Sequence, residues 1–152
     1  MTVRFSARAL VLVLSCVAAA CHSTPSEPNP SMLVSASVSP AAFHAGDAAT
    51  VTVVVENKGT RTVNLFTCPA WFEVLKGADV VAPGTQACAA SWVATSLEPG
   101  ATYTHAFAWR GDTRSLTNPP TFLAAGRYTL RAAVRVESAV FYGTPVGVEL
   151  TR

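Results

Sequence analysis

The sequence predicts an all-β protein, an antiparallel Ig-like β-sandwich of about seven or eight strands over residues 32–152. Apolar residues in this region recur with a period of two, and no window shows a convincing period of 3.6. Turn sequences containing Gly separate the alternating runs every 8–15 residues. The runs alternate with polar residues instead of being continuously apolar, which is typical of antiparallel sheets with one solvated face.

Three segments alternate most clearly, namely Thr50–Glu56, Thr102–Trp109 and Arg127–Glu137. The residues that share one face of these three strands are Val51, Val53, Val55, Tyr103, His105, Phe107, Trp109, Tyr128, Leu130, Ala132, Val134 and Val136. Shorter runs rich in Val, Phe and Thr predict further strands at Leu33–Val38, Thr62–Thr67, Trp71–Lys76 and Val146–Leu150.

The sequences between these runs have the residues of chain reversals. Gly-containing turns are expected around Gly46, Gly59, Gly100 and Gly126, and a long loop is expected over residues 83–96. Tyr128, directly after such a turn, resembles the tyrosine corner of Ig-like sandwiches, in which the hydroxyl bonds back to nearby backbone.

The first 20 residues have the three parts of an export signal. Arg4 and Arg8 form a positive region, Ala9–Val17 form an apolar region, and Ala18–Ala20 are small residues in front of Cys21. The apolar run is shorter than the roughly 20 residues that cross a membrane. The Ala-Ala-Ala-Cys end resembles a bacterial lipobox, which implies a lipid-anchored N-terminus at Cys21.

Cys16 is a second candidate for lipidation, and plain secretion or an uncleaved anchor are alternatives. Residues 21–31 after the signal are rich in Pro and Ser, which predicts an extended spacer of roughly 30 Å between membrane and domain. We therefore expect an exported, membrane-anchored lipoprotein of the cell envelope. His22, a residue other than Asp after the lipidated Cys, favours the outer membrane if the cell is Gram-negative.

Composition makes several function classes improbable. The 152 residues are 50% hydrophobic and 13% charged with a formal charge of +2, and loss of Arg4 and Arg8 with the signal would leave a neutral chain. We therefore expect no nucleic-acid partner. No nucleophile elbow, zinc-protease motif, phosphate loop or dinucleotide fingerprint occurs. We expect no catalytic residues, no metal and no cofactor.

Cys68 and Cys88 form the only cysteine pair in the predicted domain. In an exported protein two such residues most often form a disulfide. Two free thiols, or a metal site completed by His44 or His105, are the alternatives. His44 is expected in a solvated turn, and His105 is expected as a hydrogen-bonded structural residue among aromatic neighbours.

Three arginines, Arg127, Arg131 and Arg135, share one face of a predicted strand. They could attract an anionic partner, although a solvated outer sheet face is the simpler interpretation. The tryptophans Trp71, Trp92 and Trp109 are expected mostly in the core or in sheet packing.

A series of short segments from Val53 to Val134 resembles the BsuPI family of intracellular proteinase inhibitors, whose fold is an Ig-like β-sandwich. The similar segments are Val55-Glu56-Asn57, Val63-Asn64-Leu65, Phe72-Glu73-Val74, Leu97-Glu98-Pro99-Gly100 and Ala125-Gly126-Arg127-Tyr128-Thr129-Leu130. The export signal and the Cys68–Cys88 pair are departures from that family, whose namesake acts inside the cell.

Two functions follow from these observations. The first is a binding or scaffold module of the envelope without catalytic activity, and the alternative is a proteinase inhibitor that acts on serine proteases in the envelope. The partner would be an unknown envelope protein, which is a protease if the alternative holds. The segment closed by the predicted bridge is the candidate interaction segment, with Trp71, Ala78, Asp79, Pro83 and Trp92, and residues 78–87 are expected to be free to engage it.

We predict that the mature protein contains a Cys68–Cys88 disulfide. Removing it should lower the free energy of unfolding by about 2–5 kcal/mol, because the bridge restricts the unfolded chain. Non-reducing peptide mapping should find the two cysteine peptides linked. Alkylation of both thiols in the native protein would contradict the prediction.

Overall fold

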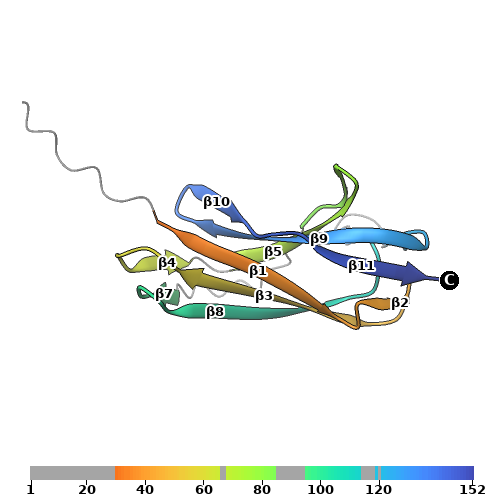
Figure 1. The fold of residues 1–152 in the computed structure, drawn as a ribbon, viewed down its shortest axis with the longest axis horizontal. Helices are drawn as coiled ribbons and strands as arrows, with labels where there is room; N and C mark the ends of the chain where they lie inside the picture. The colour runs from red at the N-terminus through yellow and green to blue at the C-terminus, as the bar shows by residue number, and fades with distance from the viewer. Residues whose placement is uncertain (1–29, 66–67, 85–94, 114–118, 120) are drawn as a thin grey trace, which may run out of the picture.

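A computed structural model describes residues 30–65, 68–84, 95–113, 119 and 121–152 of the chain (Figure 1). Its described residues form eleven β-strands and no helix, which confirms the predicted all-β class. Within these residues no helix is long and apolar enough to cross a membrane. The predicted signal, Cys21, Cys88 and Trp92 lie outside the described residues, so the predictions made for them stay predictions.

One sheet has three strands in the order β1-β3-β8, all antiparallel. Its strands are β1 (Met32–Ser39), β3 (Ala49–Asn57) and β8 (Thr102–Trp109). The central strand β3 pairs over its whole length with both neighbours, so the side chains of Val51, Val53 and Val55 lie in the middle of the inner face.

The second sheet has the strand order β2-β11-β9-β5-β6, and β10 also pairs with β9. Its strands are β2 (Ala42–His44), β11 (Val146–Thr151), β9 (Gly126–Val136), β5 (Ala70–Lys76), β6 (Asp79–Ala82) and β10 (Ala139–Tyr142). A separate two-stranded sheet pairs β4 (Val63–Leu65) with β7 (Thr95–Leu97).

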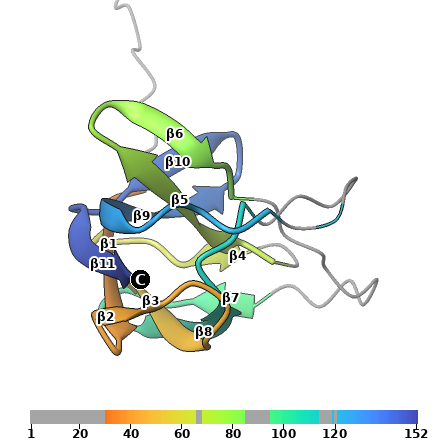
Figure 2. The ribbon, with the colours of Figure 1, turned by 90° about the vertical axis from the view of Figure 1, so that its right-hand side faces the viewer.

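The two larger sheets face one another as two layers (Figure 2). Their strand orders correspond to strands A, B and E of an Ig-like sandwich in one layer and C, F and G in the other. The chain crosses from the first sheet to the second between β1 and β2, and the Ser39-Pro40 peptide bond in this connection is cis. After it, β2 pairs in parallel with β11, whereas the other strand pairs among the described residues are antiparallel.

The core confirms most of the predicted alternation. The apolar rows of β3 and β9 are buried, and Trp109 packs edge-on against Phe43 and Phe72 with ring centroids 5.5 and 6.1 Å apart. In β8 the prediction holds for Phe107 and Trp109 only, because His105 is exposed and Tyr103 half-buried. Among the described strands β8 has a hydrogen-bonded neighbour on one side only, so its side chains are covered less completely than those of β3.

Four strands have no counterpart among the predicted ranges, namely β2, β6, β7 and β10. Each is three or four residues long, which is too short to display an alternating pattern. One prediction is therefore wrong in detail, because residues 79–82 form β6 instead of a free segment. His44 is the last residue of β2 and also the first residue of the predicted turn, which the Asp47 amide closes on the His44 carbonyl at 3.0 Å, and its side chain is exposed as expected.

Two predicted local structures are confirmed. The Tyr128 hydroxyl donates a hydrogen bond to the carbonyl oxygen of Ala124 over 2.7 Å, as a tyrosine corner requires. The turn before β8 has Pro99 at its second position and Gly100 at its third with a φ of 78°, and the Ala101 amide closes it on the Glu98 carbonyl at 3.0 Å.

Asn57, at the end of β3, is the one polar residue buried among those described. Its Nδ2 donates to the carbonyl oxygens of Arg61 and Leu97 at 2.8 and 2.9 Å, and its Oδ1 accepts from the Gly59 amide at 2.9 Å. Its backbone carbonyl also accepts from the Gly100 amide. One side chain thus joins the turn after β3 to the end of β7.

We expect Asn57→Ala to lower the free energy of unfolding by about 2–4 kcal/mol, because it removes one buried and two part-buried hydrogen bonds to the backbone. Urea denaturation would measure the change. Asn64→Ala is the matched control, since Asn64 is exposed and accepts only from the Ser96 hydroxyl. Equal losses in the two variants would contradict a special role for Asn57.

Two glycines of the last hairpin differ sharply in their surroundings. A Cβ atom on Gly143, between β10 and β11, would lie 2.5 Å from the carbonyl oxygen of Val34 in β1. A Cβ atom on Gly147 in β11 would meet nothing within 4 Å. The close approach of β1 to the β10–β11 connection therefore requires glycine at position 143.

Gly143→Ala should accordingly destabilise the protein by about 1–3 kcal/mol, the usual range for overpacking against backbone. Gly147→Ala, its control in the same hairpin, should leave stability nearly unchanged. Thermal denaturation of both variants is the measurement. A neutral Gly143→Ala would show that β1 moves away without loss, contrary to the packing described.

Candidate functional site

The predicted interaction residues do not form one cluster. Trp71 lies half-buried on the outer face of β5, close to its first residue, whereas Ala78 and Asp79 are exposed at the far end of the β5–β6 hairpin. Pro83 is exposed directly after β6, near the Trp71 end. The hairpin therefore separates the residues that the sequence places in one segment.

Gly77 explains why this segment is a hairpin. Lys76 pairs with Asp79 across a two-residue turn, and the φ of Gly77 at its first position is 64°, a value that glycine adopts without strain. The turn brings β6 back alongside β5 and makes β6 the last strand of its sheet among the described residues.

Cys68 precedes β5 and has a left-handed φ of 55°. Its sulfur is not a free thiol. The pairing of Cys68 with Cys88 stays a prediction, because Cys88 lies outside the described part of the chain.

Trp71 has two neighbours on the outer face of the sheet. A Cβ atom on Gly84 would lie 1.8 Å from Cδ1 of Trp71, so the backbone that follows β6 packs directly on the indole. The guanidinium carbon of Arg135 lies 5.9 Å from the centroid of the indole ring, within the range of a cation–π contact.

The outward-facing residues of β9 form a continuous row, which we call the β9 outer row. It consists of Arg127, Thr129, Arg131, Ala133 and Arg135, which confirms the predicted common face of the three arginines. Because neighbours on one face of a strand are two residues apart, an arginine occurs at every second position of the row.

Arg131 is the most constrained of these arginines. Its Nη2 and Nε atoms lie 2.6 and 3.2 Å from one carboxylate oxygen of Glu73 on β5, and its guanidinium carbon lies 4.4 Å from the ring centroid of Tyr142 on β10. The predicted solvated face is thus only partly solvated at this point, because Arg131 is held between two neighbouring strands.

Two aromatic side chains flank Ala133. The strand register places Trp71 of β5 and Tyr142 of β10 directly opposite Ala133, on its two sides. β5 and β10 pair with β9 on its two sides, so opposite Cα atoms of these two outer strands lie about 9–10 Å apart. The two rings therefore belong to one local surface. Tyr142 is 51% exposed, whereas Ala133 between the rings is buried.

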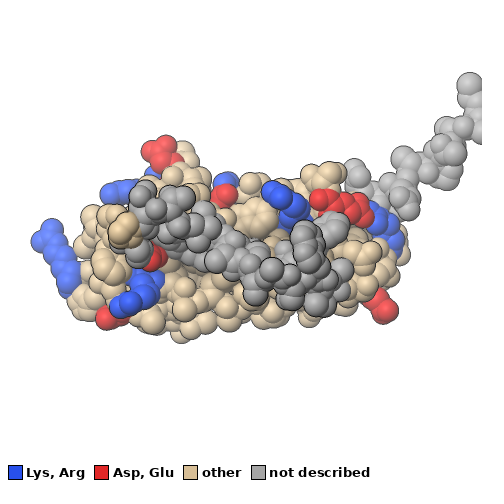
Figure 3. Space-filling model, turned by 180° about the vertical axis from the view of Figure 1, so that it is seen from behind, with Lys and Arg blue, Asp and Glu red and all other residues tan. Residues whose placement is uncertain are grey.

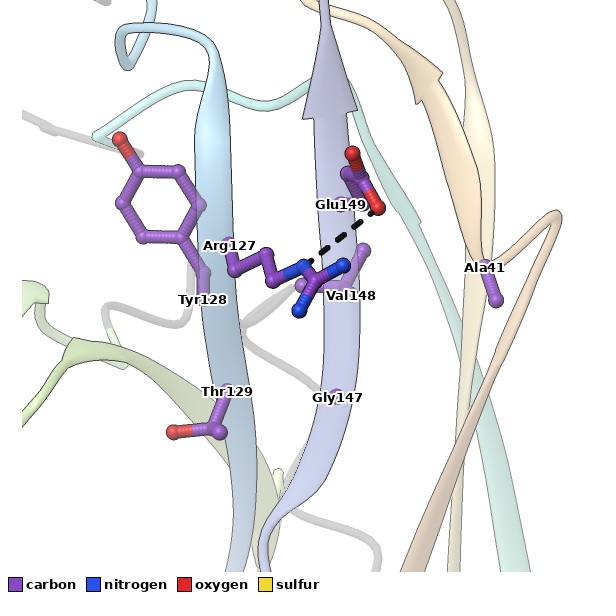
Figure 4. A pocket seen from close by; sticks show the side chains of 7 residues that line it. All are labelled: Ala41, Arg127, Tyr128, Thr129, Gly147, Val148 and Glu149. Carbon is purple, nitrogen blue, oxygen red and sulfur yellow. Dashed lines mark ion pairs between the residues drawn. The ribbon is translucent and has the colours of Figure 1, made fainter.

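A hollow of about 400 Å³ lies on the same face between β9, β11 and the residue before β2 (Figure 4). Gly147 and Thr129 lie opposite one another in the strand register, and the missing side chain of Gly147 leaves space beside Thr129. Figure 4 shows Arg127 reaching from β9 across β11 toward Glu149, with Nε and Oε2 3.8 Å apart.

The charges of this face are mixed. Arg127 and Arg131 each have a carboxylate neighbour, Glu149 and Glu73, whereas no carboxylate among the described residues pairs with Arg135. Arg127 is 90% exposed, so its ion pair contributes little to stability. Figure 3 shows basic and acidic side chains interspersed along the side of the six-stranded sheet, whereas the opposite margin is largely uncharged.

Each of the two histidines singled out in the sequence has its Nδ1 atom near a hydroxyl group. His105 is exposed, its Nδ1 lies 3.5 Å from the Tyr103 hydroxyl, and its ring stacks at 6.3 Å on that of Tyr103. Burial raises the pKa of the Tyr103 hydroxyl. His44 Nδ1 lies 3.1 Å from the hydroxyl of Thr151. The described residues hold no group of three or more side chains suited to a metal ion.

Two ion pairs of the described residues lie away from the β9 outer row, namely Lys58–Glu56 and, at the turn between β9 and β10, Arg61–Glu137. Both guanidinium nitrogens of Arg61 bond to the Glu137 carboxylate at 2.9 and 3.1 Å, and these bonds lower the pKa of that carboxyl. Glu137 has a φ of 54° in a two-residue turn, a conformation that glycine adopts more readily.

Sequence reasoning identified the three arginines and Trp71 but missed Tyr142, Glu73, Glu149 and Gly147 as their neighbours. These four residues reach the β9 outer row through strand pairing, and Tyr142 belongs to a strand of four residues. The outward parity of Glu73 and of Glu149 on their predicted strands was the signal that pointed to this face.

No family model matches the chain, and no curated protein matches its sequence. Its structure is similar to that of the β-glucosidase EmGH1 from Erythrobacter marinus, with a TM-score of 0.50 and 15% identity over 80% of this chain and 16% of that chain. A β-glucosidase from Listeria innocua gives a TM-score of 0.47 and 11% identity over 80% of this chain and 16% of its own.

The CARDB domain of the PF1109 protein from Pyrococcus furiosus, solved in complex with di-metal ions, gives a TM-score of 0.46 and 20% identity. That alignment covers 80% of this chain and 87% of the domain. The chain spans only 16% of the length of the β-glucosidases. At these identities the likeness concerns the fold alone.

Proposed function

We propose that the protein is a lipid-anchored binding module of the bacterial cell envelope, with a BsuPI-like domain and no catalytic activity. The observation that carries the proposal is the β9 outer row with its flanking rings. The export signal and the lipobox-like sequence before Cys21 supply the location, and the Pro-rich spacer holds the domain away from the membrane.

Several properties of this face suit binding. Trp71, Tyr142 and the arginines are residue types enriched among those that dominate interfaces. Trp71 and the arginines project from the central strands β5 and β9, Tyr142 projects from the neighbouring β10, and Arg131 is already held by Glu73 and Tyr142. Ordered side chains on a rigid sheet lose less entropy when a partner docks, which favours affinity.

An inhibitor of envelope serine proteases is the second candidate, and one observation favours it. The β5–β6 hairpin forms one margin of its sheet and exposes Ala78 and Asp79 at a tight turn (Figure 2). A rigid exposed turn is what an inhibitor must present to a protease. Titration of serine proteases with the mature chain tests this, and prompt digestion or no inhibition across the panel would contradict it.

We predict that Cys21 is the lipidated residue. Cells fed a clickable fatty acid should label the wild-type protein, and Cys21→Ala should abolish the label and release the protein from the membrane fraction. Cys16→Ala is the matched control and should label normally. Undiminished labelling of the Cys21→Ala protein would overturn the anchor.

The binding surface has its own test. Mature chain immobilised on beads should retain envelope material, quantified by mass spectrometry, and the double variant Arg135→Ala with Tyr142→Ala should retain much less. The control exchanges Ser37 and Thr104 for Ala, on the outer face of the other sheet. Equal retention by all three proteins would exclude the β9 outer row as the binding surface.

A further inference from the structure

We infer that the ligand of the β9 outer row is a carboxylate-bearing glycan chain that lies along β9. The inference rests on the proposed function, because it names the partner of the same surface. Four features of the face carry it: the balance of its charges, its two aromatic side chains, the hollow beside Gly147 and its position in the middle of a sheet.

The charges exclude a densely anionic partner such as a nucleic acid. Glu73 and Glu149 stand beside two of the three arginines, so the face offers both hydrogen-bond donors and acceptors. A nucleic acid has a phosphate at every step and would be repelled by the two carboxylates. A sugar chain with hydroxyl groups throughout and a carboxylate at intervals matches both the donors and the acceptors. Arg135 has no carboxylate neighbour among the described residues, so it is the arginine that would bind the ligand's carboxylate.

The rings supply the second contact that a sugar requires. A pyranose ring has apolar C–H faces that stack on aromatic rings, whose faces carry partial negative charge. Trp71 and Tyr142 lie on either side of Ala133, and Tyr142 is 51% exposed. Tyr142 supplies the exposed ring, whereas Trp71 is half-buried beside the backbone of Gly84. An exposed ring on an open sheet surface suits a polymer that lies flat across it rather than a small molecule enclosed on all sides.

The hollow accommodates a unit further along the same chain. Its volume of about 400 Å³ falls within the usual range of small-molecule sites, roughly 300–1,000 Å³. Arg127 lies at one end of it, and Arg131 is the next arginine along β9. From Arg127 to Arg135 the row extends over roughly 26 Å, at about 3.3 Å for each of eight residues, so the ligand must be extended.

The position of the row argues against an extended peptide. Peptides that bind sheets add a strand at an edge and use its free backbone groups. β9 pairs with β5 on one side and with β11 and β10 on the other, so its backbone is already bonded. A ligand of this face must be recognised by side chains alone, through stacking and charge-assisted hydrogen bonds.

Isothermal titration of the detergent-solubilised mature chain tests the inference with three probes. Hyaluronan oligosaccharides carry a carboxylate on every second sugar, chitin oligosaccharides are neutral, and polyglutamate has carboxylates without sugars. We expect hyaluronan to bind more tightly than either. Arg135→Ala should weaken that binding about tenfold, the scale of a lost hydrogen bond to a charged group, and Tyr142→Ala should weaken it several-fold.

Matched controls separate the surface from general charge. Arg110→Ala removes an arginine outside the row, whose Nε donates to the Gly46 carbonyl, and should leave hyaluronan binding unchanged. Tyr142→Phe keeps the ring and should retain most of the affinity. Equal binding of polyglutamate and hyaluronan, or an equal effect of Arg110→Ala and Arg135→Ala, would overturn glycan recognition.

The outcomes also distinguish this inference from the function on which it rests. Suppose that no glycan binds, while the Arg135 and Tyr142 double variant still retains less envelope material than the wild type. Glycan recognition is then wrong, and the proposed binding module stands. If the double variant captures envelope material as well as the wild type, both ideas fail together.

Discussion

The burial of the apolar row of β9 determines which side chains of this strand point outward. Tyr128, Leu130 and Val134 belong to the buried row of this strand, and the three arginines alternate with that row. A shift of the register by one residue would move every side chain to the other face and bring charged guanidinium groups into the core. The hydrophobic effect therefore fixes both the packing of the two sheets and the positions of the arginines.

Side-chain hydrogen bonds to the backbone fix the ends of the strands. The Asn57 side chain saturates three backbone groups where β3, β4 and β7 meet, and the Tyr128 hydroxyl does so at the entry to β9. Gly143 lets β1 approach the β10–β11 connection. These local arrangements orient the strands, and through them the flanking residues of the β9 outer row.

The sequence predicted the long strands because their alternation extends over seven or more residues, as in β3 and β9. It predicted the tyrosine corner and the Pro99–Gly100 turn because each depends on neighbouring residues. Four strands of three or four residues, β2, β6, β7 and β10, were missed, and Tyr142 with them. The candidate site was predicted only in part, since the contacts of Arg131 with Glu73 and Tyr142 join residues from separate strands, a juxtaposition that no local pattern records.

An open sheet face binds more weakly than an enclosed pocket, because solvent keeps access to the ligand and only part of its surface is buried. The proposed membrane anchor would compensate for this weakness. Many copies tethered at one membrane by a spacer of roughly 30 Å can contact successive repeats of one polymer, and each further contact is intramolecular once the first has formed. The proposed glycan and the proposed lipid anchor are therefore matched, because the modest affinity of one β9 outer row would become firm attachment through the number of copies.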